Sequence, residues 1–185
     1  MIISLTGTPG TGKTSVSEIL KENGFKVIDL NKLAKEKNYI IGKDRKRNSN
    51  IVDLNKINKF FKNLKNDTNI IVDGHLSHFI KNVDKVIILR CNPKKLKENL
   101  KKKQWKDRKI IENIEAEILD IILSETIEIH KIENLIEIDT TDLSIDKVAK
   151  IIINLINNNF KNIKKYKIGK IDWSEELLKD NNLLG

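Results

Sequence analysis

Cysteine is nearly absent from this sequence, with Cys91 the only one among 185 residues. A single cysteine excludes an intramolecular disulfide framework and a metal site built from several cysteines, and it favours a reducing compartment. Long apolar runs are also missing, as is a basic N-terminal segment followed by an apolar signal. These absences predict a soluble, cytoplasmic protein with no membrane contact.

Arginine is scarce as well. Arg45, Arg47, Arg90 and Arg108 are the only arginines, although lysine and arginine together number 35 and the formal net charge is +9. Arginine makes bidentate contacts with phosphate that lysine cannot copy, so few side chains could assist a phosphoryl transfer in that way. The positive charge fits nucleotides, RNA or another acidic partner, but an AT-rich coding bias towards Lys, Ile and Asn explains it equally well.

The composition supports one domain with a short appendage. Hydrophobic residues make up 39% of the chain, which is enough for a real core. We expect a compact domain over residues 1–159 and a basic tail over residues 160–185. In the tail, lysines interleaved with Tyr166 could contact RNA, whereas Trp173 and Leu177 could pack back on the core. We expect packing, with the lysines forming a basic rim.

The segment GTPGTGKT, residues 7–14, matches the pattern G-x-x-x-x-G-K-[ST]. An apolar, strand-like run precedes it and a helical stripe follows it, so strand, loop and helix come in the order that the motif requires. In this context backbone N–H groups surround a polyphosphate, Lys13 neutralises the β- and γ-phosphates, and the Thr14 hydroxyl ligates Mg²⁺. The alternative, a glycine-rich turn and nothing more, is disfavoured by the full match. The motif predicts nucleotide binding but does not separate a kinase from an ATPase or a GTPase.

Apolar runs and amphipathic stretches alternate along the rest of the chain. Unbroken apolar runs predict buried strands, and apolar stripes at helical spacing predict helices. The predicted strands lie at 2–5, 27–28, 70–73, 86–89 and 135–138, and the predicted helices at 16–20, 54–64, 93–100, 110–129 and 144–156. We interpret residues 31–52 as a polar segment. The alternation predicts an α/β fold with a doubly wound five-stranded parallel sheet, whose ligands bind at the carboxyl ends of the strands.

Two side chains of interest follow the predicted strand at 70–73. Asp73 is placed where P-loop enzymes have an acid that holds the Mg²⁺ shell; the alternative is an aspartate that only caps the next turn. His75 could point at the γ-phosphate and position a water, or it could be a hydrogen-bonded structural residue, and the Asp-x-His spacing leaves these alternatives even. His78, on the following turn, is expected to be structural.

Two basic segments could face the phosphates. The run from Lys101 to Lys109 could be a lid that brings positive charge to the transferred phosphoryl group, or it could be a solvated helix face. Trp105 favours the lid, because a bulky aromatic side chain in a basic segment needs a packing partner. Arg45 and Arg47 could grip the phosphate of a second nucleotide, but an exposed charged loop is about as consistent with them.

Four motifs together resemble the adenylate kinase isoenzyme 6 family, which comprises small nucleoside monophosphate kinases and ATPases linked to small-ribosomal-subunit maturation. These are the loop GTPGTGKT, the VDGH after the third predicted strand, the LRCNP before a helix, and KKQWKDRKIIENIEAEI. The likeness covers residues 1–156, and the closing KIDWSEEL is similar to the tails of archaeal members. Ordinary adenylate kinases have Asp-Gly-Phe-Pro-Arg where this chain has Asp73-Gly74-His75-Leu76-Ser77.

The resemblance implies a P-loop fold of the nucleoside monophosphate kinase type. It implies a monophosphate-binding arm at about residues 30–53 and a lid at about 103–113. ATP would be bound by Gly10, Gly12, Lys13, Thr14 and Ser15. Lys13, Asp73 and His75 would have catalytic roles, and Mg²⁺ would be held through Thr14 and Asp73. Many members have Arg-Gly-Tyr at the lid start, where this chain has Lys103-Gln104-Trp105. Lys103 is a weaker substitute for a planar guanidinium, and Arg108 could compensate, so we expect modest kinase activity.

Two functions of different classes follow from the resemblance. The first is a broad-specificity nucleoside monophosphate kinase, ATP + AMP = 2 ADP, with ATPase activity. The second is an ATP-hydrolysing assembly factor that binds a small-subunit ribosomal protein or rRNA, with kinase activity secondary. A different small-molecule P-loop kinase is a weaker third alternative.

Overall fold

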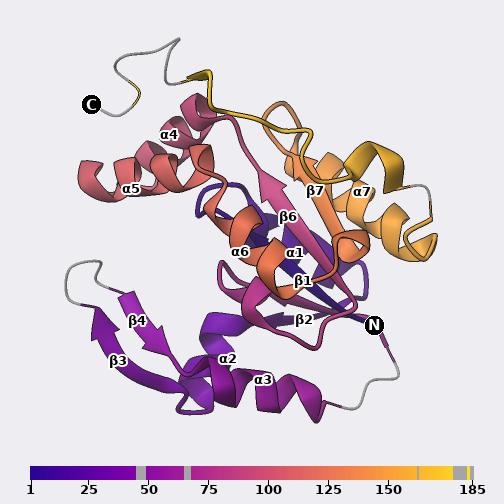
Figure 1. Ribbon diagram of the computed structural model, residues 1–185. Coiled ribbons are helices and arrows are strands. Elements are labelled where there is room, and N and C mark those ends of the chain that lie inside the picture. The colour runs from indigo at the N-terminus through magenta and orange to yellow at the C-terminus, as the bar shows by residue number, and fades with distance from the viewer. Residues whose placement is uncertain (45–48, 65–67, 162, 177–182, 184–185) are drawn as a thin grey trace.

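A computed structural model describes residues 1–44, 49–64, 68–161, 163–176 and 183 (Figure 1). Its centre is a sheet of five strands, and every pairing in it is parallel. In spatial order the strands are β2 (Lys26–Asp29), β5 (Ile70–Asp73), β1 (Ile2–Gly7), β6 (Lys85–Arg90) and β7 (Leu135–Asp139). The predicted five-stranded parallel sheet is confirmed.

Helices cover both faces of the sheet because successive strand residues point to opposite sides. On one face, Ile3, Ile87 and Ile136 pack in a core with α1 (Lys13–Glu22) and α7 (Ile145–Asn157). On the other face, Ile70 and Val72 pack with α2 (Leu30–Glu36) and α3 (Leu54–Lys62), and Val86 and Ile88 pack with α6 (Ile121–Ile129). Short 3-10 helices lie at Ser77–Phe79, Ile132–Asn134 and Ile163–Tyr166.

Three of the predicted helices, those at 54–64, 93–100 and 144–156, begin at polar N-caps. The carboxylate of Asp53 accepts the amide hydrogens of Asn55 and Lys56, both at 3.1 Å, at the start of α3. Asn92 caps α4 (Pro93–Lys102), with proline at the first helical position, and Ser144 caps α7. Such polar caps satisfy the free N–H groups of a first helical turn.

The prediction of a single helix over residues 110–129 is wrong. The structure has two helices there, α5 (Asp107–Ile118) and α6, because the chain turns at Asp120, whose φ is 52°. Arg90 contacts the chain at this break: its Nη2 donates to the carbonyl of Glu117 at 3.1 Å and also to the Asp120 carboxylate. In α6, Leu123 and Thr126 are buried while Ile121 is exposed.

The segment 31–52 is more ordered than its polar composition indicated. It contains most of α2 and an antiparallel hairpin of β3 (Ile40–Asp44) and β4 (Ser49–Val52). The sequence did not predict this hairpin because it packs little: Ile40, Ile41 and Ile51 are all exposed. The chain between the two strands lies outside the described residues.

The tail returns to the body of the protein. The Gly169 amide donates to Glu137 at 3.0 Å. Trp173 and the buried Leu183 then pack against the apolar cluster formed by α4 and α5. The expected packing of Trp173 is therefore found, whereas Leu177 lies outside the described residues. Among the described helices, none combines the length and the apolar character needed to cross a membrane.

Candidate active site

The glycine-rich loop joins β1 to α1 at the carboxyl edge of the sheet. Gly7, Gly10 and Gly12 have φ angles of 139°, 102° and 93°, which side-chain-bearing residues rarely adopt. A Cβ on Gly7 would lie 2.3 Å from the backbone oxygen of Leu89, and one on Gly10 would lie 2.8 Å from Cδ1 of Leu96. Both the turn and the close packing of this loop therefore require glycine.

The N-terminus of α1 opens to solvent beside this loop. Gly12 is the N-cap, and Thr14 and Ser15 are exposed in the first turn. Free N–H groups and the positive end of the helix dipole make such a terminus a binding place for phosphate. The arrangement suits the predicted phosphate ligands Gly10, Gly12, Thr14 and Ser15.

Lys13 lies at the centre of the loop and is buried. Its Nζ donates to the carbonyl oxygens of Gly7 at 2.6 Å and Thr8 at 2.9 Å. Burial lowers the pKa of Lys13 to about 8, and the carboxylates of Asp73 and Glu117 oppose this shift. An amine held among loop carbonyls can exchange these acceptors for the oxygens of a bound polyphosphate.

Asp73 ends β5 beside the loop, in register with Leu5 of β1 and Asp29 of β2. Burial raises the pKa of its carboxyl group, Lys13 opposes the shift, and Asp29 adds to it. The nearby Ser17 hydroxyl, which is also buried, acts in the opposite direction and lowers the pKa of this carboxyl group. The structure therefore brings the predicted Asp73 and Lys13 together.

These donors fit Mg²⁺. Asp73 and Thr14 offer a carboxylate and a hydroxyl oxygen, and Mg²⁺ takes oxygen ligands, typically one or two from the protein with the rest from phosphates and water. Among the residues that the structure describes, no cluster of three or more acidic, histidine or cysteine side chains could hold a metal ion by itself. The metal would thus depend on the nucleotide phosphates.

His75 follows Asp73 by two residues, and its side chain is exposed. Its carbonyl accepts a hydrogen bond from the Thr6 hydroxyl at 3.3 Å. Partial withdrawal from water lowers the pKa of His75 to about 4, and the charges of Lys13 and Lys109 contribute to the shift. The ring is consequently neutral at pH 7 and has a free acceptor nitrogen.

His78 is structural, as predicted. Its side chain is 1% exposed. Its Nδ1 lies 3.1 Å from the Thr6 hydroxyl and its Nε2 lies 3.0 Å from the Glu125 carboxylate.

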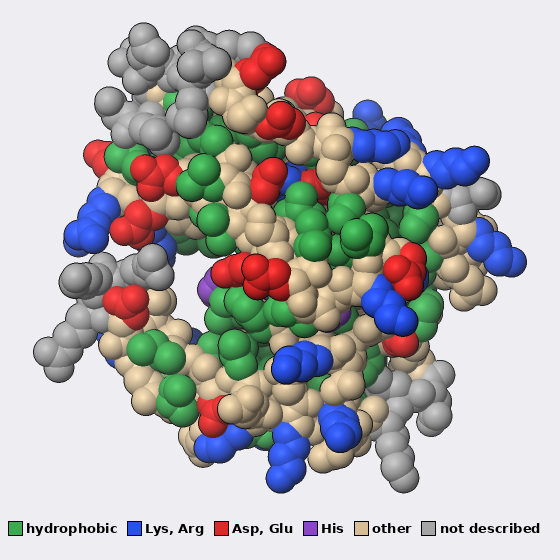
Figure 2. All heavy atoms as spheres, viewed as in Figure 1, with side chains coloured by type: hydrophobic (Ala, Val, Ile, Leu, Met, Phe, Trp, Pro, Cys, Tyr) green, Lys and Arg blue, Asp and Glu red, His purple; other side chains and the backbone are tan. Residues whose placement is uncertain are grey.

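The predicted lid at about 103–113 consists of a short turn followed by the start of α5. Trp105 packs against the α4–α5 cluster, and Nζ of Lys109 lies 4.0 Å from the centre of its ring. The charge of Lys103 is felt at Lys13, whose pKa it helps to lower. Figure 2 shows a hollow between the α4–α5 pair and the β3–β4 hairpin, with a histidine side chain at its inner edge.

Of the three arginines predicted to act in the site, the structure describes Arg108. The side chain of Arg108 is 74% exposed, and its Nε lies 3.4 Å from Glu112 one turn further along α5. Arg45 and Arg47 lie outside the described residues. Their roles remain predictions.

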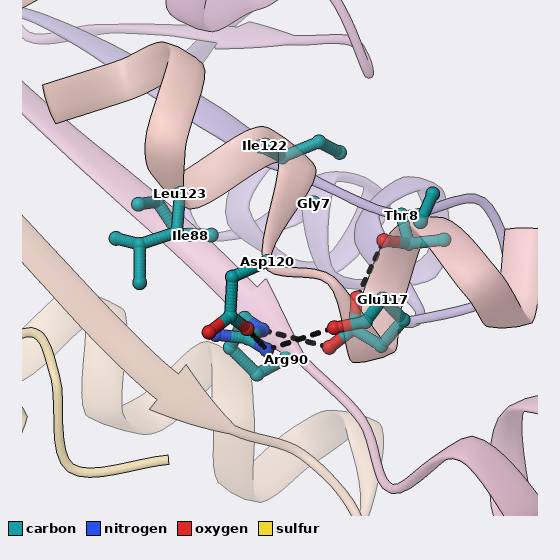
Figure 3. A pocket seen from close by; sticks show the side chains of 9 residues that line it. Gly7, Thr8, Ile88, Arg90, Glu117, Asp120, Ile122 and Leu123 are labelled. Carbon is teal, nitrogen blue, oxygen red and sulfur yellow. Dashed lines mark hydrogen bonds and ion pairs between the residues drawn. The ribbon is translucent and has the colours of Figure 1, made fainter. Parts of the chain in front are cut away.

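The structure shows a buried charge cluster that the sequence analysis missed (Figure 3). Arg90, at the end of β6, contacts the carboxylates of Glu117, Asp120 and Glu137. Glu117 in turn accepts the hydroxyl hydrogen of Thr8 in the loop at 2.5 Å. One signal was available, since Glu117 is in the same helical stripe as Ile110 and Ile114, where only apolar residues are expected.

The parallel sheet, the glycine loop and the buried Lys13 within it define a P-loop protein with a nucleotide kinase fold. A family model described as an AAA domain matches residues 3–120. Shikimate kinase from Acinetobacter baumannii has a TM-score of 0.60 at 17% identity, with 87% of this chain and 95% of that chain covered. Thymidylate kinase from Candida albicans has a TM-score of 0.53 at 16% identity, with 85% and 91% covered. At these identities the likeness shows the fold alone.

Full-length relatives identify the family. A protein of Archaeoglobus fulgidus is 44% identical over 177 residues, covering 96% of this chain and 94% of the relative. A protein of Methanocaldococcus jannaschii is 39% identical over 178 residues, covering 95% and 94%. Both bear the name "Putative adenylate kinase". The chain belongs to this archaeal adenylate kinase family, which the motif resemblance had indicated.

Proposed function

We propose that the protein is a nucleoside monophosphate kinase of broad specificity that transfers the γ-phosphoryl group of Mg-ATP to AMP, with ATP hydrolysis as a second activity. The observation that carries the proposal is the buried Lys13 held inside the glycine loop, with Asp73 close enough for each charge to shift the other's pKa, at the carboxyl edge of a parallel sheet. The name of the archaeal relatives supports the same reaction.

The loop side of the site would hold ATP. The amides of Gly10 and Gly12, the Lys13 ammonium and the first-turn residues Thr14 and Ser15 surround the place of the polyphosphate. Thr14 and Asp73 would hold Mg²⁺, whose charge offsets the charge that develops on the phosphates. An oxygen of the AMP phosphate then forms a bond to the γ-phosphorus as the bond to the β-phosphate oxygen breaks, and two ADP molecules result.

The lid side would supply positive charge. Lys103 is near enough to Lys13 to affect its pKa, and we assign it the stabilisation of the transferred group, with Arg108 as a second cation. An ammonium does this less well than a guanidinium, so turnover should be modest. AMP would enter between the lid and the β3–β4 hairpin, with Arg45 and Arg47 as its proposed phosphate ligands.

A second candidate rests on His75. Its neutral ring, near Lys13, can accept a proton from a water molecule or orient it towards the γ-phosphate. The protein would then be an ATP-hydrolysing factor in the cytoplasm that assists small ribosomal subunit maturation, with a small-subunit ribosomal protein or rRNA as partner. The lysine-rich tail is the surface we assign to that partner.

ATP consumption with and without each monophosphate tests these proposals. We expect ADP formation to depend on AMP in the wild type and to rise in Lys103→Arg, whereas Lys101→Arg, a matched exposed position on α4, should change nothing. Equal hydrolysis without AMP that is lost in His75→Ala would favour the ATPase. No stimulation by any monophosphate, with strong stimulation by an unrelated acceptor, would contradict both.

A further inference from the structure

Glu117 is a charged residue on the buried face of α5, and its side chain is 2% exposed. Both of its carboxylate oxygens are used. Oε2 accepts the Thr8 hydroxyl hydrogen at 2.5 Å, and Oε1 accepts from Nε of Arg90 at 2.7 Å and from the Cys91 amide at 3.1 Å. A single carboxylate therefore connects helix α5 with the phosphate loop and with the end of β6 (Figure 3).

Within the loop, both Lys13 and Thr11 donate hydrogen bonds to Thr8. Its carbonyl accepts from Nζ of Lys13 at 2.9 Å and from the Thr11 hydroxyl at 2.9 Å. The Thr11 amide also donates to this carbonyl, at 3.3 Å. The hydroxyl of the same residue is anchored on Glu117, so the position of the loop backbone around Lys13 depends on a side chain of α5.

The need to neutralise the charge of Arg90 does not by itself explain why a buried glutamate occupies position 117. Arg90 carries one positive charge and is contacted by three carboxylates, so Asp120 and Glu137 would already compensate it. Burying a carboxylate as completely as Glu117 costs desolvation energy, which its hydrogen bonds must offset. Only Glu117, of these three, reaches the loop through Thr8.

We propose that Glu117 is a positioning residue for phosphoryl transfer: through the Thr8 hydroxyl it holds the phosphate loop in the shape that presents Lys13 to the nucleotide. The inference rests on the proposed kinase function.

Thr8→Val tests this link without touching the contacts of Arg90, because valine has nearly the shape of threonine and lacks the hydroxyl. The matched control is Thr8→Ser, which keeps the hydroxyl. We expect Thr8→Val to lower kcat about 10-fold and to weaken ADP binding by a similar factor, as the loss of a hydrogen bond to a charged group predicts. Thr8→Ser should stay within about twofold of the wild type, since it restores the bond.

A purely structural role predicts a different pattern, namely a lower Tm for Thr8→Val with unchanged kcat and ADP affinity measured well below that Tm. That pattern would overturn the inference. The double variant Thr8→Val with Glu117→Gln completes a double-mutant cycle. If Glu117 acts through Thr8, adding Glu117→Gln to Thr8→Val changes kcat little further. If the effects of the two substitutions on kcat multiply instead, the inference is overturned. ADP affinity is measured by calorimetry, so the inference remains testable on binding even if no monophosphate is phosphorylated.

Discussion

Nε of Arg90 donates a hydrogen bond of 2.7 Å to Oε1 of Glu117, and both side chains are almost completely buried. This pair joins the end of β6 to α5, the helix whose first turns belong to the predicted lid. The guanidinium also contacts Asp120 and Glu137, so one cation holds together β6, β7 and the α5–α6 junction. The nearby carboxylates, Glu117 first, raise the pKa of Arg90 despite its burial.

Replacing Arg90 with methionine should strongly destabilise the protein. Methionine fills similar space but leaves the three carboxylates without their cation, and removing one partner of a buried ion pair costs about 3–5 kcal/mol. Urea unfolding measures the change. Arg108→Met is the control, because that exposed side chain should change the free energy of unfolding by no more than about 0.5 kcal/mol. Equal stability of the two variants would contradict the role given to Arg90.

Lys13→Met should abolish nucleotide binding and yet stabilise the fold at pH 7. In the folded protein the pKa of Lys13 falls from its ordinary value of 10.5 to about 8 because the amine is buried. That shift corresponds to a cost of roughly 3 kcal/mol for keeping the charge. Losing its hydrogen bonds to Gly7 and Thr8 offsets part of the gain, so a net increase of about 1–2 kcal/mol is expected.

The pH dependence gives the sign of this effect a separate check. The pKa of Lys13 is lower in the folded protein than in the unfolded chain. The free-energy cost of keeping its buried amine charged is therefore fully present below pH 8 and disappears as the pH rises through 10.5. The stability advantage of Lys13→Met over the wild type should therefore shrink by about 2 kcal/mol between pH 7 and pH 9.5. An advantage that grows over this interval would show that burial does not depress the pKa.

Nucleotide affinity should fall above about pH 8. Free Lys13 begins to lose its proton there, whereas bound phosphates hold the proton on the amine. Binding then requires proton uptake, and Kd for ADP should rise towards tenfold per pH unit. Calorimetry at pH 9 in two buffers of different ionisation enthalpy measures the uptake directly. At pH 7 the same pair of buffers should give equal binding enthalpies, and a flat Kd up to pH 9.5 would refute the prediction.

Gly7→Ala should unfold the loop or the protein, whereas Gly24→Ala should be tolerated. Both glycines have positive φ, so each alanine incurs a conformational cost of about 1–2 kcal/mol. Only at Gly7 would the added Cβ also overlap a backbone oxygen, that of Leu89, while a Cβ at Gly24 meets nothing within 4 Å. Thermal unfolding of the two variants separates the conformational cost from the overlap. Similar Tm values would show that the β6 backbone can move away.

Most helices and strands could be predicted from the sequence because their signals are local. The apolar runs of β1 and β6 and the caps at Asp53, Asn92 and Ser144 act within a few residues of the chain. The prediction failed at Asp120, where the chain at the helix break contacts Arg90, which is 30 residues away along the chain. The β3–β4 hairpin was missed because its exposed isoleucines carry no burial pattern.

Within the site, the residues next to the loop were predictable and their surroundings were not. Lys13 and Asp73 meet because strands β1 and β5 are neighbours whose carboxyl ends share one edge. Arg108 matched the expected lid, but packing leaves it pointing along α5 to Glu112. Cys91 gave no functional signal, and in the structure burial raises the pKa of its thiol to about 12, so it is not a reactive thiol.

The sequence by itself determined the glycine loop and the alternation of strands and helices, because each depends on neighbours in the chain. Only the tertiary structure decided the strand order, the direction of Arg90 into the core and the link from Glu117 to Thr8. Those features depend on which distant side chains share a buried space, where every charge must find a partner.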